Sequence, residues 1–298
     1  MLWGIDLGGT KIECAVIEDS LHHEPVCRER IATEGNQGYS HIIAQVVKLV
    51  DQVKSISGLT PETIGIGTPG ALEPSTQLMK NCNTTALIGK PFRADLENAL
   101  GIPVKIANDA NCFALAEARM GAARSVAPDA EVVFGIIMGT GVGGGIVVNG
   151  KVINGRHGLG GEWGHNFLDE SGGKCYCGRI GCVETLISGP ALERFYRKHS
   201  GNALHLKEIV QRYEEGADEA AKATMQHLVT YFGKAVGPVI NIIDPEVIVI
   251  GGGVGNIDLL YTEGVSEVRK YVFNSRLDTI FLKPALGDSA GVFGAAIL

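Results

Sequence analysis

Apolar and polar positions along this chain switch repeatedly between a strand pattern and a helix pattern. Short apolar runs bounded by glycine or proline are typical of buried strands, while apolar residues spaced three and four apart indicate amphipathic helices. Strands that alternate with helices predict an α/β fold. The predicted strands include 63–68, 104–107 and 247–250, and the predicted helices are 38–56, 92–100, one from Asn111, and segments near 189–199, 205–214 and 218–243.

A glycine-rich hairpin pattern occurs twice. Residues 2–17 and 132–148 each consist of an apolar strand, a turn of glycine and threonine, and a second apolar strand. Such turns favour residues that tolerate positive φ and leave the backbone bare. Two copies predict two related α/β domains, which we place at residues 1–117 and 118–288. The small-residue segment at about 289–298 is predicted to form a helix that packs back on the first domain.

Length and charge restrict the classes of protein to which the chain can belong. Its 298 residues exceed the usual size of one hydrophobic core, in agreement with two domains. A net charge of −7 and a pI near 5.6 argue against a nucleic-acid partner, because binding phosphates needs a concentrated basic surface. The apolar stretches are too short to cross a bilayer, and no basic segment opens the chain. We therefore expect a cytoplasmic protein without a membrane anchor or signal peptide.

Residues 162–184 contain the most specific chemical pattern in the chain. His165, Cys175, Cys177 and Cys182 form a Cys₃His set, which tetrahedral zinc favours in closed structural sites. The sequence predicts a zinc loop over residues 165–182, in which the metal shapes the loop and carries no chemistry itself. The carboxylates Glu162 and Glu184 bracket this loop. The other cysteines are expected to be reduced core thiols: Cys14, Cys27, Cys82 and Cys112.

The two glycine turns are the second chemical signal. The stretch from Asp6 to Lys11 offers backbone N–H groups, a hydroxyl and a cation, which suit phosphate oxygens. The stretch 138–145 offers the same groups without the cation. Neither is a Walker loop or a dinucleotide fingerprint, because each turn leads into a strand. A single such turn is most often only a turn, but two at matched positions could hold one triphosphate, with Asp6 placed to bind Mg²⁺.

Asn108 and Asp109 are polar residues between a predicted strand and an apolar helix. They can act simply as the N-cap of that helix, a position that asparagine and aspartate favour. Alternatively, Asp109 is a carboxylate at the carboxyl end of a strand, where α/β folds bind ligands. A base that takes a proton from a sugar hydroxyl during phosphoryl transfer is usually such an aspartate. The residues alone leave both interpretations open.

Taken together, these motifs resemble the ROK family (repressors, open reading frames and kinases), in the family's order and over essentially the whole chain. The matching segments are Asp6-Leu-Gly-Gly-Thr-Lys11, Gly67-Thr-Pro-Gly70, Asn108-Asp-Ala-Asn111, Gly139-Thr-Gly-Val-Gly-Gly144, Glu162-x-Gly-His165 and Cys175-x-Cys-Gly-x-x-Gly-Cys-x-Glu184.

The resemblance implies two actin-like (ribonuclease-H-like) domains with a ligand cleft between them. It implies a homodimer and ATP-dependent phosphorylation of a hexose at its 6-hydroxyl, with Mg²⁺ accompanying ATP. Asp109 resembles the general base, and His165 is expected to bridge zinc and sugar through its two ring nitrogens. The implied sugar contacts are Gly70, Asn83, Asn108, Asp109, Glu162, His165 and Glu184, and the implied nucleotide contacts are Gly9, Thr10, Lys11, Thr140, Gly141 and Gly252. Family repressors carry a DNA-binding module before the first glycine motif, which we do not expect here because Asp6 is the sixth residue.

Within the family, the segments 80–92, 161–166 and 184–189 look most like fructokinases that also accept mannose, so fructose is the favoured substrate. N-acetylhexosamine kinases share the stretch 108–115, and glucokinase is a further alternative. A non-catalytic sugar sensor is the alternative from another class, but a sensor needs neither a base nor a phosphate clamp.

Two expectations concern how these parts work together. If the second glycine turn clamps the triphosphate, Gly141→Val should raise the KM for ATP far more than that for the sugar. If zinc orients His165 toward the sugar, loss of zinc should weaken sugar affinity while nucleotide affinity changes little. The competing interpretation is that zinc only holds together a loop that lies far from the sugar.

Overall fold

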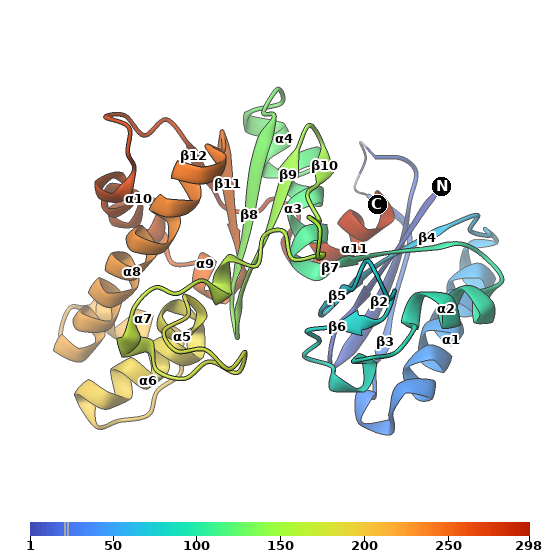
Figure 1. Cartoon of the computed structure of the whole chain (residues 1–298), viewed down its shortest axis with the longest axis horizontal. Coiled ribbons are helices and arrows are strands. Elements are labelled where there is room, and N and C mark those ends of the chain that lie inside the picture. The colour runs from blue at the N-terminus through green and yellow to red at the C-terminus, as the bar shows by residue number, and fades with distance from the viewer. Residues whose placement is uncertain (21, 23) are drawn as a thin grey trace. The chain divides into compact units, whose positions relative to one another are not determined.

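The computed structural model describes residues 1–20, 22 and 24–298 and divides them into two compact units (Figure 1). The expected boundary after residue 117 is displaced, because residues 118–129 and 145–161 belong with the first unit. Helix α4 (Ala122–Val126) packs on α3 (Asp109–Arg119), and a Cβ on Gly145 would lie 2.7 Å from the carbonyl oxygen of Ala110, so both segments are tied to α3. Unit 1 comprises Met1–Asp129, Gly145–Gly161 and Ala285–Leu298, and unit 2 comprises Ala130–Gly144 and Glu162–Pro284.

Unit 1 is built on a five-stranded sheet of order β3-β2-β1-β4-β7. The first glycine hairpin supplies β1 and β2, which pair antiparallel, while β1, β4 and β7 run parallel. The carboxyl ends of these parallel strands therefore meet at one edge of the sheet. The strands are β1 (Leu2–Leu7), β2 (Lys11–Ile17), β3 (Pro25–Ala32), β4 (Ile64–Thr68) and β7 (Val104–Asn108).

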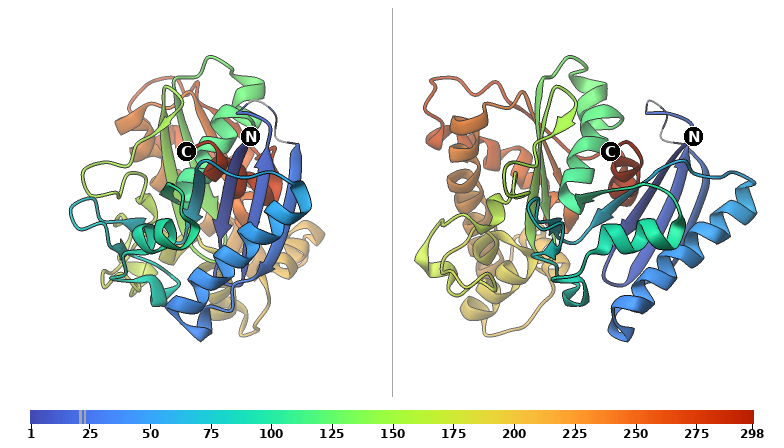
Figure 2. Two further views of the ribbon diagram at one scale, coloured as in Figure 1. Left: turned by 90° about the vertical axis from the view of Figure 1, so that its right-hand side faces the viewer. Right: turned by 45° about the vertical axis from the view of Figure 1, so that its right-hand side comes forward.

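Helices cover both faces of this sheet, as Figure 2 shows for the blue and teal helices on one side and the red helix on the other. Because side chains alternate along a strand, Trp3, Ile5 and Leu7 point to one face of β1 and join the main core with α1. The intervening Gly4 and Asp6 point to the other face. The covering helices are α1 (Tyr39–Ser57), α2 (Phe92–Leu100), α3 (Asp109–Arg119) and α11 (Ala290–Ala296).

The C-terminal helix α11 lies directly on β1 and β4 because glycines leave room for its backbone. A Cβ on Gly4 would lie 2.1 Å from the carbonyl oxygen of Val292, and one on Gly65 would lie 1.8 Å from that of Ala295. Gly294 in turn would meet the carbonyl oxygen of Cys112 at 1.7 Å. No side chain fits at such distances, so these three positions require glycine.

The second sheet repeats the order of the first, β10-β9-β8-β11-β12. Here β8 and β9 come from the second glycine hairpin, and β8, β11 and β12 run parallel. Two sheets with the same order confirm the predicted α/β class and the inference of two related halves. The strands are β8 (Val132–Met138), β9 (Val142–Val148), β10 (Lys151–Val152), β11 (Val247–Gly251) and β12 (Ile280–Leu282).

The long helix α8 (Glu219–Ile243) is the centre of the helical layer in unit 2. Helix α8 begins after the N-cap Asp218, whose side chain accepts from Ala221 N, and ends at Asp244 in a left-handed conformation. It packs against α6, α7 and α10. The helices of this unit are α5 (Glu184–Ile187), α6 (Gly189–Ser200), α7 (Leu206–Glu215), α8 (Glu219–Ile243), α9 (Gly252–Gly255) and α10 (Glu263–Val268).

The hydrophobic pattern missed short or exposed elements. Strand β3 lies at the edge of its sheet, and its alternating charged residues hide the apolar side. Elements of two to five residues carry too few positions to show a period: β5 (Ala71–Leu72), β6 (Met79–Lys80) and α4 (Ala122–Val126). No helix in the described part of the chain is both long and apolar enough to cross a membrane.

Candidate functional site

The predicted metal ligands converge in unit 2. The side chains of His165, Cys175, Cys177 and Cys182 place their ligand atoms within 4.8 Å of one another. Cys175 Sγ lies 3.6 Å from His165 Nδ1, and Cys177 Sγ lies 3.6 Å from Cys182 Sγ. A tetrahedral zinc site with bonds of about 2.3 Å to sulfur and about 2.0 Å to nitrogen separates its ligand atoms by roughly 3.5–3.8 Å. The four residues therefore fit such an ion.

Glycines and short turns shape the loop that carries these ligands. His165 ends the 3₁₀ turn Trp163–His165, and the loop returns through the bridges Phe167–Cys182 and Lys174–Ile180. Gly181 has a φ of +73°, and a Cβ there would lie 2.4 Å from the carbonyl oxygen of Asp169. Only glycine allows the chain to turn back at this point and bring Cys182 beside the other sulfurs.

The second ring nitrogen of His165 has a partner that the sequence did not indicate. Its Nε2 lies 3.0 Å from the hydroxyl of Tyr176, and the two rings pack edge to face with centroids 5.1 Å apart. Burial raises the pKa of Tyr176 to about 12, and the charges of Glu184 and Glu162 act in the same direction. The nitrogen expected to meet the sugar is held by a tyrosine in this structure.

Glu184, expected to be a sugar contact, also holds the second glycine turn, which we define as residues 139–144. Its Oε2 accepts a hydrogen bond from Val142 N at 2.9 Å. A Cβ on Gly141 would lie only 2.6 Å from the same oxygen. The N–H of Val142 thus donates to Glu184. Thr140 and Gly141 are then the residues of this turn that remain to contact a phosphate. Gly252, at the start of α9, has a φ of +82° and approaches the carbonyl oxygen of Met138.

The first glycine turn, residues 8–11, is fixed by hydrogen bonds on its inner side, and its outer backbone is exposed. Gly8 N donates to Lys11 O at 2.9 Å, and the buried Thr33 donates its hydroxyl to Gly8 O at 2.7 Å. Gly9 and Thr10 are exposed. The nearest atom to a Cβ on Gly9 would be Thr84 Oγ1, at 3.9 Å. This turn is therefore a rigid loop whose outer backbone is accessible.

Asp6 lies opposite Glu13 on β1 and β2. Burial raises the pKa of Asp6 from 3.8 to about 6, and the charge of Glu13 adds to this shift, while Lys11 and Arg30 oppose it. Glu13 is itself almost fully buried and accepts hydrogen bonds from Arg28 Nε at 2.5 Å and from Arg30 Nε at 2.9 Å. A carboxylate that burial holds in a poorly solvated place suits a divalent cation, as expected for Asp6.

Asp6→Asn is expected to stabilise the fold while weakening Mg²⁺ binding. The native carboxyl holds its proton up to about pH 6, whereas the unfolded one releases it near 3.8. The free energy of unfolding therefore falls as the pH rises through about 6. A shift of this size corresponds to up to about 3 kcal/mol. Urea unfolding should show a larger gain for Asp6→Asn at pH 8 than at pH 5. An equal gain at both values would show that the pKa is not raised.

The expected base and its neighbours lie at the carboxyl edge of the first sheet. Asn108 ends β7 beside Thr68 of β4, and its side chain accepts from Ala110 N at 2.9 Å, so it is the N-cap of α3. Asp109 is exposed in the first turn of α3 and accepts from the same N–H at 2.8 Å. Gly70, with a φ of +149°, follows β4, and the exposed Asn83 is tied to this bend because its N–H donates to Pro69 O at 3.2 Å.

The candidate residues are thus divided between the units. Unit 1 carries Asp6, Gly9, Thr10 and Lys11 at the first turn and Gly70, Asn83, Asn108 and Asp109 at the sheet edge. Unit 2 carries Thr140, Gly141, Glu162, His165, Glu184 and Gly252, together with the metal ligands.

Sequence reasoning missed several residues that support these groups: Glu13, Thr33, Trp163 and Tyr176. Only Tyr176 and Trp163 carried a signal, since each stands between two predicted site residues.

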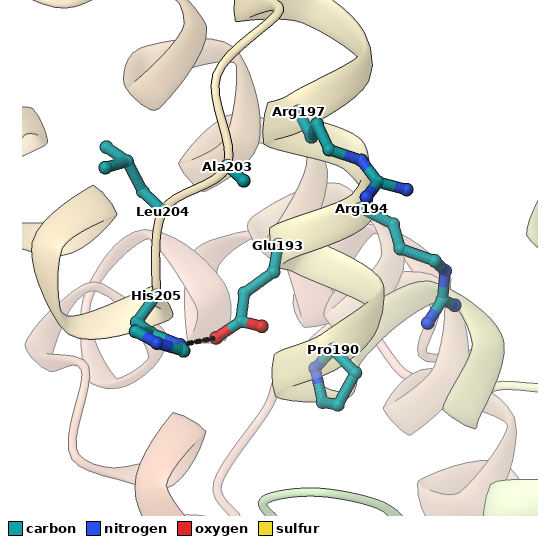
Figure 3. Close-up of a pocket in the computed structure, with 7 residues that line it drawn as sticks. All are labelled: Pro190, Glu193, Arg194, Arg197, Ala203, Leu204 and His205. Carbon is teal, nitrogen blue, oxygen red and sulfur yellow. Dashed lines mark ion pairs between the residues drawn. The ribbon is translucent and has the colours of Figure 1, made fainter.

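A surface pocket of about 290 Å³ lies between α6 and the segment before α7, and no predicted site residue lines it (Figure 3). Arg194 and Arg197 line one side, and Glu193 forms an ion pair of 3.6 Å with His205 across it. Pro190 at its edge follows Gly189, whose N–H donates to Gly139 O of the second glycine turn at 2.8 Å.

Comparison with known proteins places this geometry in a family. The ROK family model matches residues 2–298. The chain is 37% identical to the N-acetyl-D-glucosamine kinase of Pasteurella multocida (strain Pm70) over 309 residues, which cover 100% of this chain and 99% of the relative.

Solved structures agree with that placement. The ROK hexokinase from Thermus thermophilus superposes with a TM-score of 0.88 at 31% identity, over 99% of this chain and 96% of that one. A ROK family glucokinase from Streptomyces griseus, solved with glucose and AMPPNP, gives a TM-score of 0.79 at 26% identity, over 99% and 98%. The paired sheets, the glycine turns and these full-length matches lead to one conclusion: the chain belongs to the ROK family.

Proposed function

We propose that this chain is an ATP-dependent sugar kinase whose substrate is N-acetylglucosamine, phosphorylated at its 6-hydroxyl. The observation that carries the proposal is the 37% identity with an N-acetyl-D-glucosamine kinase over the whole of this chain. Relatives described as N-acetyl-D-glucosamine kinases from Mannheimia succiniciproducens and Vibrio cholerae are each 36% identical over the same span. This support favours the N-acetylhexosamine alternative over fructose.

In the proposed reaction, Asp109 takes the proton from the sugar hydroxyl as its oxygen forms a bond to the γ-phosphorus. The bond between that phosphorus and the bridging oxygen breaks, and ADP leaves. The exposed position of Asp109 at the carboxyl end of β7 supports this role, since a base must reach the hydroxyl directly. Most of the rate enhancement in such reactions comes from positioning and charge stabilisation.

Other residues have proposed roles that follow their surroundings. The glycine turns bind phosphate oxygens through their backbone, and Mg²⁺, near Asp6, neutralises charge on the phosphates when bound. We propose zinc as the ion of the Cys₃His cluster, because two pairs of its ligand atoms, each 3.6 Å apart, have the spacing of a tetrahedral site. The proposed sugar contacts remain Gly70, Asn83, Asn108, Glu162, His165 and Glu184, and the homodimer remains a prediction, which light scattering would test.

The substrate is tested by measuring ADP release with N-acetylglucosamine, N-acetylmannosamine, glucose, fructose and mannose. We expect the highest kcat/KM for N-acetylglucosamine. A site built to hydrogen-bond an acetamido group should discriminate strongly against sugars that lack it, because its polar groups are then left unpaired. A higher kcat/KM for fructose would instead support the fructokinase-like motifs. Sugar binding without ADP release would identify a sensor.

Gly9→Ala is expected to separate the phosphate role of the first turn from its structural role. The fold has space for this methyl group and the φ of Gly9 is not positive, so unfolding free energy should change by less than about 0.5 kcal/mol. The KM for ATP should rise while the KM for the sugar stays constant. Unchanged values of both would show that the turn does not touch the nucleotide.

Gly141→Val cannot serve the same purpose, contrary to expectation. Its side chain would strike Glu184 before any ligand is present. A change at Gly141 therefore disturbs a proposed sugar contact together with the turn.

A further inference from the structure

The second glycine turn is tied by several contacts to the segment that carries the metal ligands, which we call the metal segment (residues 162–189). Trp163 Nε1 donates to Gly143 O at 2.9 Å, and the Glu184 carboxylate accepts from Val142 N at 2.9 Å. Gly189 N donates to Gly139 O at 2.8 Å. The turn is thus fixed at its beginning, middle and end by three hydrogen bonds to one segment.

Close packing adds to these hydrogen bonds. A Cβ on Gly164 would lie 1.9 Å from Val142 O, so the backbone of the metal segment lies directly against the turn. Trp163 is 4% exposed, and its ring packs edge to face on Phe134 of β8 with centroids 5.8 Å apart. Such packing leaves the indole little freedom and fixes the direction of its N–H.

The metal ligands set the position of these contacts. His165 lies two residues after Trp163, and Cys182 lies two residues before Glu184. Val183 N also donates to Asn166 O at 3.0 Å, which ties the two arms of the segment together beside the cluster. An ion bound by His165 and Cys182 would therefore fix the distance between Trp163 and Glu184, whose side chains hydrogen-bond to the turn.

We propose that the metal segment positions the second glycine turn for the nucleotide, and that Trp163 and Glu184 are positioning residues for nucleotide binding. The proposal rests on the proposed function, in which this turn binds phosphate. Backbone N–H groups bind phosphate well only when they are fixed in advance, because ordering them on binding costs free energy. Glu184 then serves nucleotide affinity through the backbone of Val142, besides any contact with the sugar.

The test measures binding of a non-hydrolysable ATP analogue with Mg²⁺ by calorimetry, using the full chain. Trp163→Phe keeps an aromatic ring against Phe134 but loses the N–H to Gly143 O, and should weaken nucleotide binding about threefold to tenfold. Glu184→Ala should weaken it about tenfold or more. Glu184→Gln should restore most of the affinity, because its amide oxygen can accept from Val142 N. Glu170→Ala, at an exposed position of the same segment, is the matched control and should bind as wild type.

Hydrogen exchange at the Val142 amide is the second measurement, and it does not depend on nucleotide. Exchange should be faster in Glu184→Ala and after chelation of the metal, and close to wild type in Glu184→Gln. Nucleotide affinity within twofold of wild type in both Trp163→Phe and Glu184→Ala, or unchanged exchange at Val142, would overturn the inference. A wild type that binds no nucleotide would overturn the proposed function, and the inference with it.

Discussion

Replacing Asp109 by asparagine is expected to lower kcat by about 10²–10⁴-fold, the usual contribution of a general base. The asparagine oxygen can still accept from Ala110 N, as Asp109 Oδ1 does at 2.8 Å, so the first turn of α3 should keep its geometry. The amide cannot take the proton of the sugar hydroxyl. Sugar affinity, measured by calorimetry, should therefore change by less than about threefold while kcat falls by the factor given above.

The control for this prediction is Asp218→Asn. Asp218 also begins a helix and accepts a backbone N–H, from Ala221 at 3.0 Å, but it lies at the start of α8 and is assigned no role in the reaction. It should leave kcat unchanged. If Asp109→Asn keeps a kcat near that of wild type, Asp109 is only part of the α3 N-terminus, the other interpretation that its sequence allows.

Removing the metal, or one of its ligands, is expected to have the second largest effect. Cys177→Ser is the most informative change, because Cys177 is exposed and its hydroxyl replacement carries little desolvation cost of its own. Structural zinc contributes directly to folding free energy, so we expect a loss of about 3 kcal/mol or more in urea unfolding. Sugar affinity should fall at least about tenfold, because the ring of His165 loses the bond that fixes its direction.

Elemental analysis should find one zinc ion per wild-type chain and none in Cys177→Ser. Cys27→Ser is the control for metal content alone, since Cys27 is a buried free cysteine on β3, outside the cluster, and its variant should keep the metal. A wild type without bound zinc, or a metal-free variant that binds sugar as tightly as wild type, would contradict the coupling of metal and sugar.

This experiment also distinguishes two views of the metal. From the sequence, nucleotide affinity should hardly depend on zinc, because the glycine turns are remote from the cysteines along the chain. The contacts of Trp163 and Glu184 with residues 139–144 lead to the opposite expectation, a loss of nucleotide affinity together with sugar affinity. Calorimetry with both ligands on one preparation of Cys177→Ser decides between them.

The role of Tyr176 shows where prediction from neighbouring residues stops. Spacing placed His165 with the three sulfurs, because all four lie on one short loop whose glycines let it fold back. Spacing did not show that Tyr176 would point its hydroxyl at His165 Nε2, 3.0 Å away. The direction of a side chain depends on the path of the loop, which the bridge between Lys174 and Ile180 determines.

Local sequence determined the elements and the chemical groups of this protein. The apolar alternation of β1, the glycine turns, the N-cap at Asn108 and the Cys₃His set all depend on residues close in the chain, so the sequence alone is enough to recognise them. Tertiary structure alone decided which of these groups touch. Two hydrogen bonds join residues that are distant in sequence, one from Val142 N to Glu184 and one from Arg28 Nε to Glu13. Such pairs depend on strand register and on how segments pack, and packing reflects the whole chain at once, which no local pattern records.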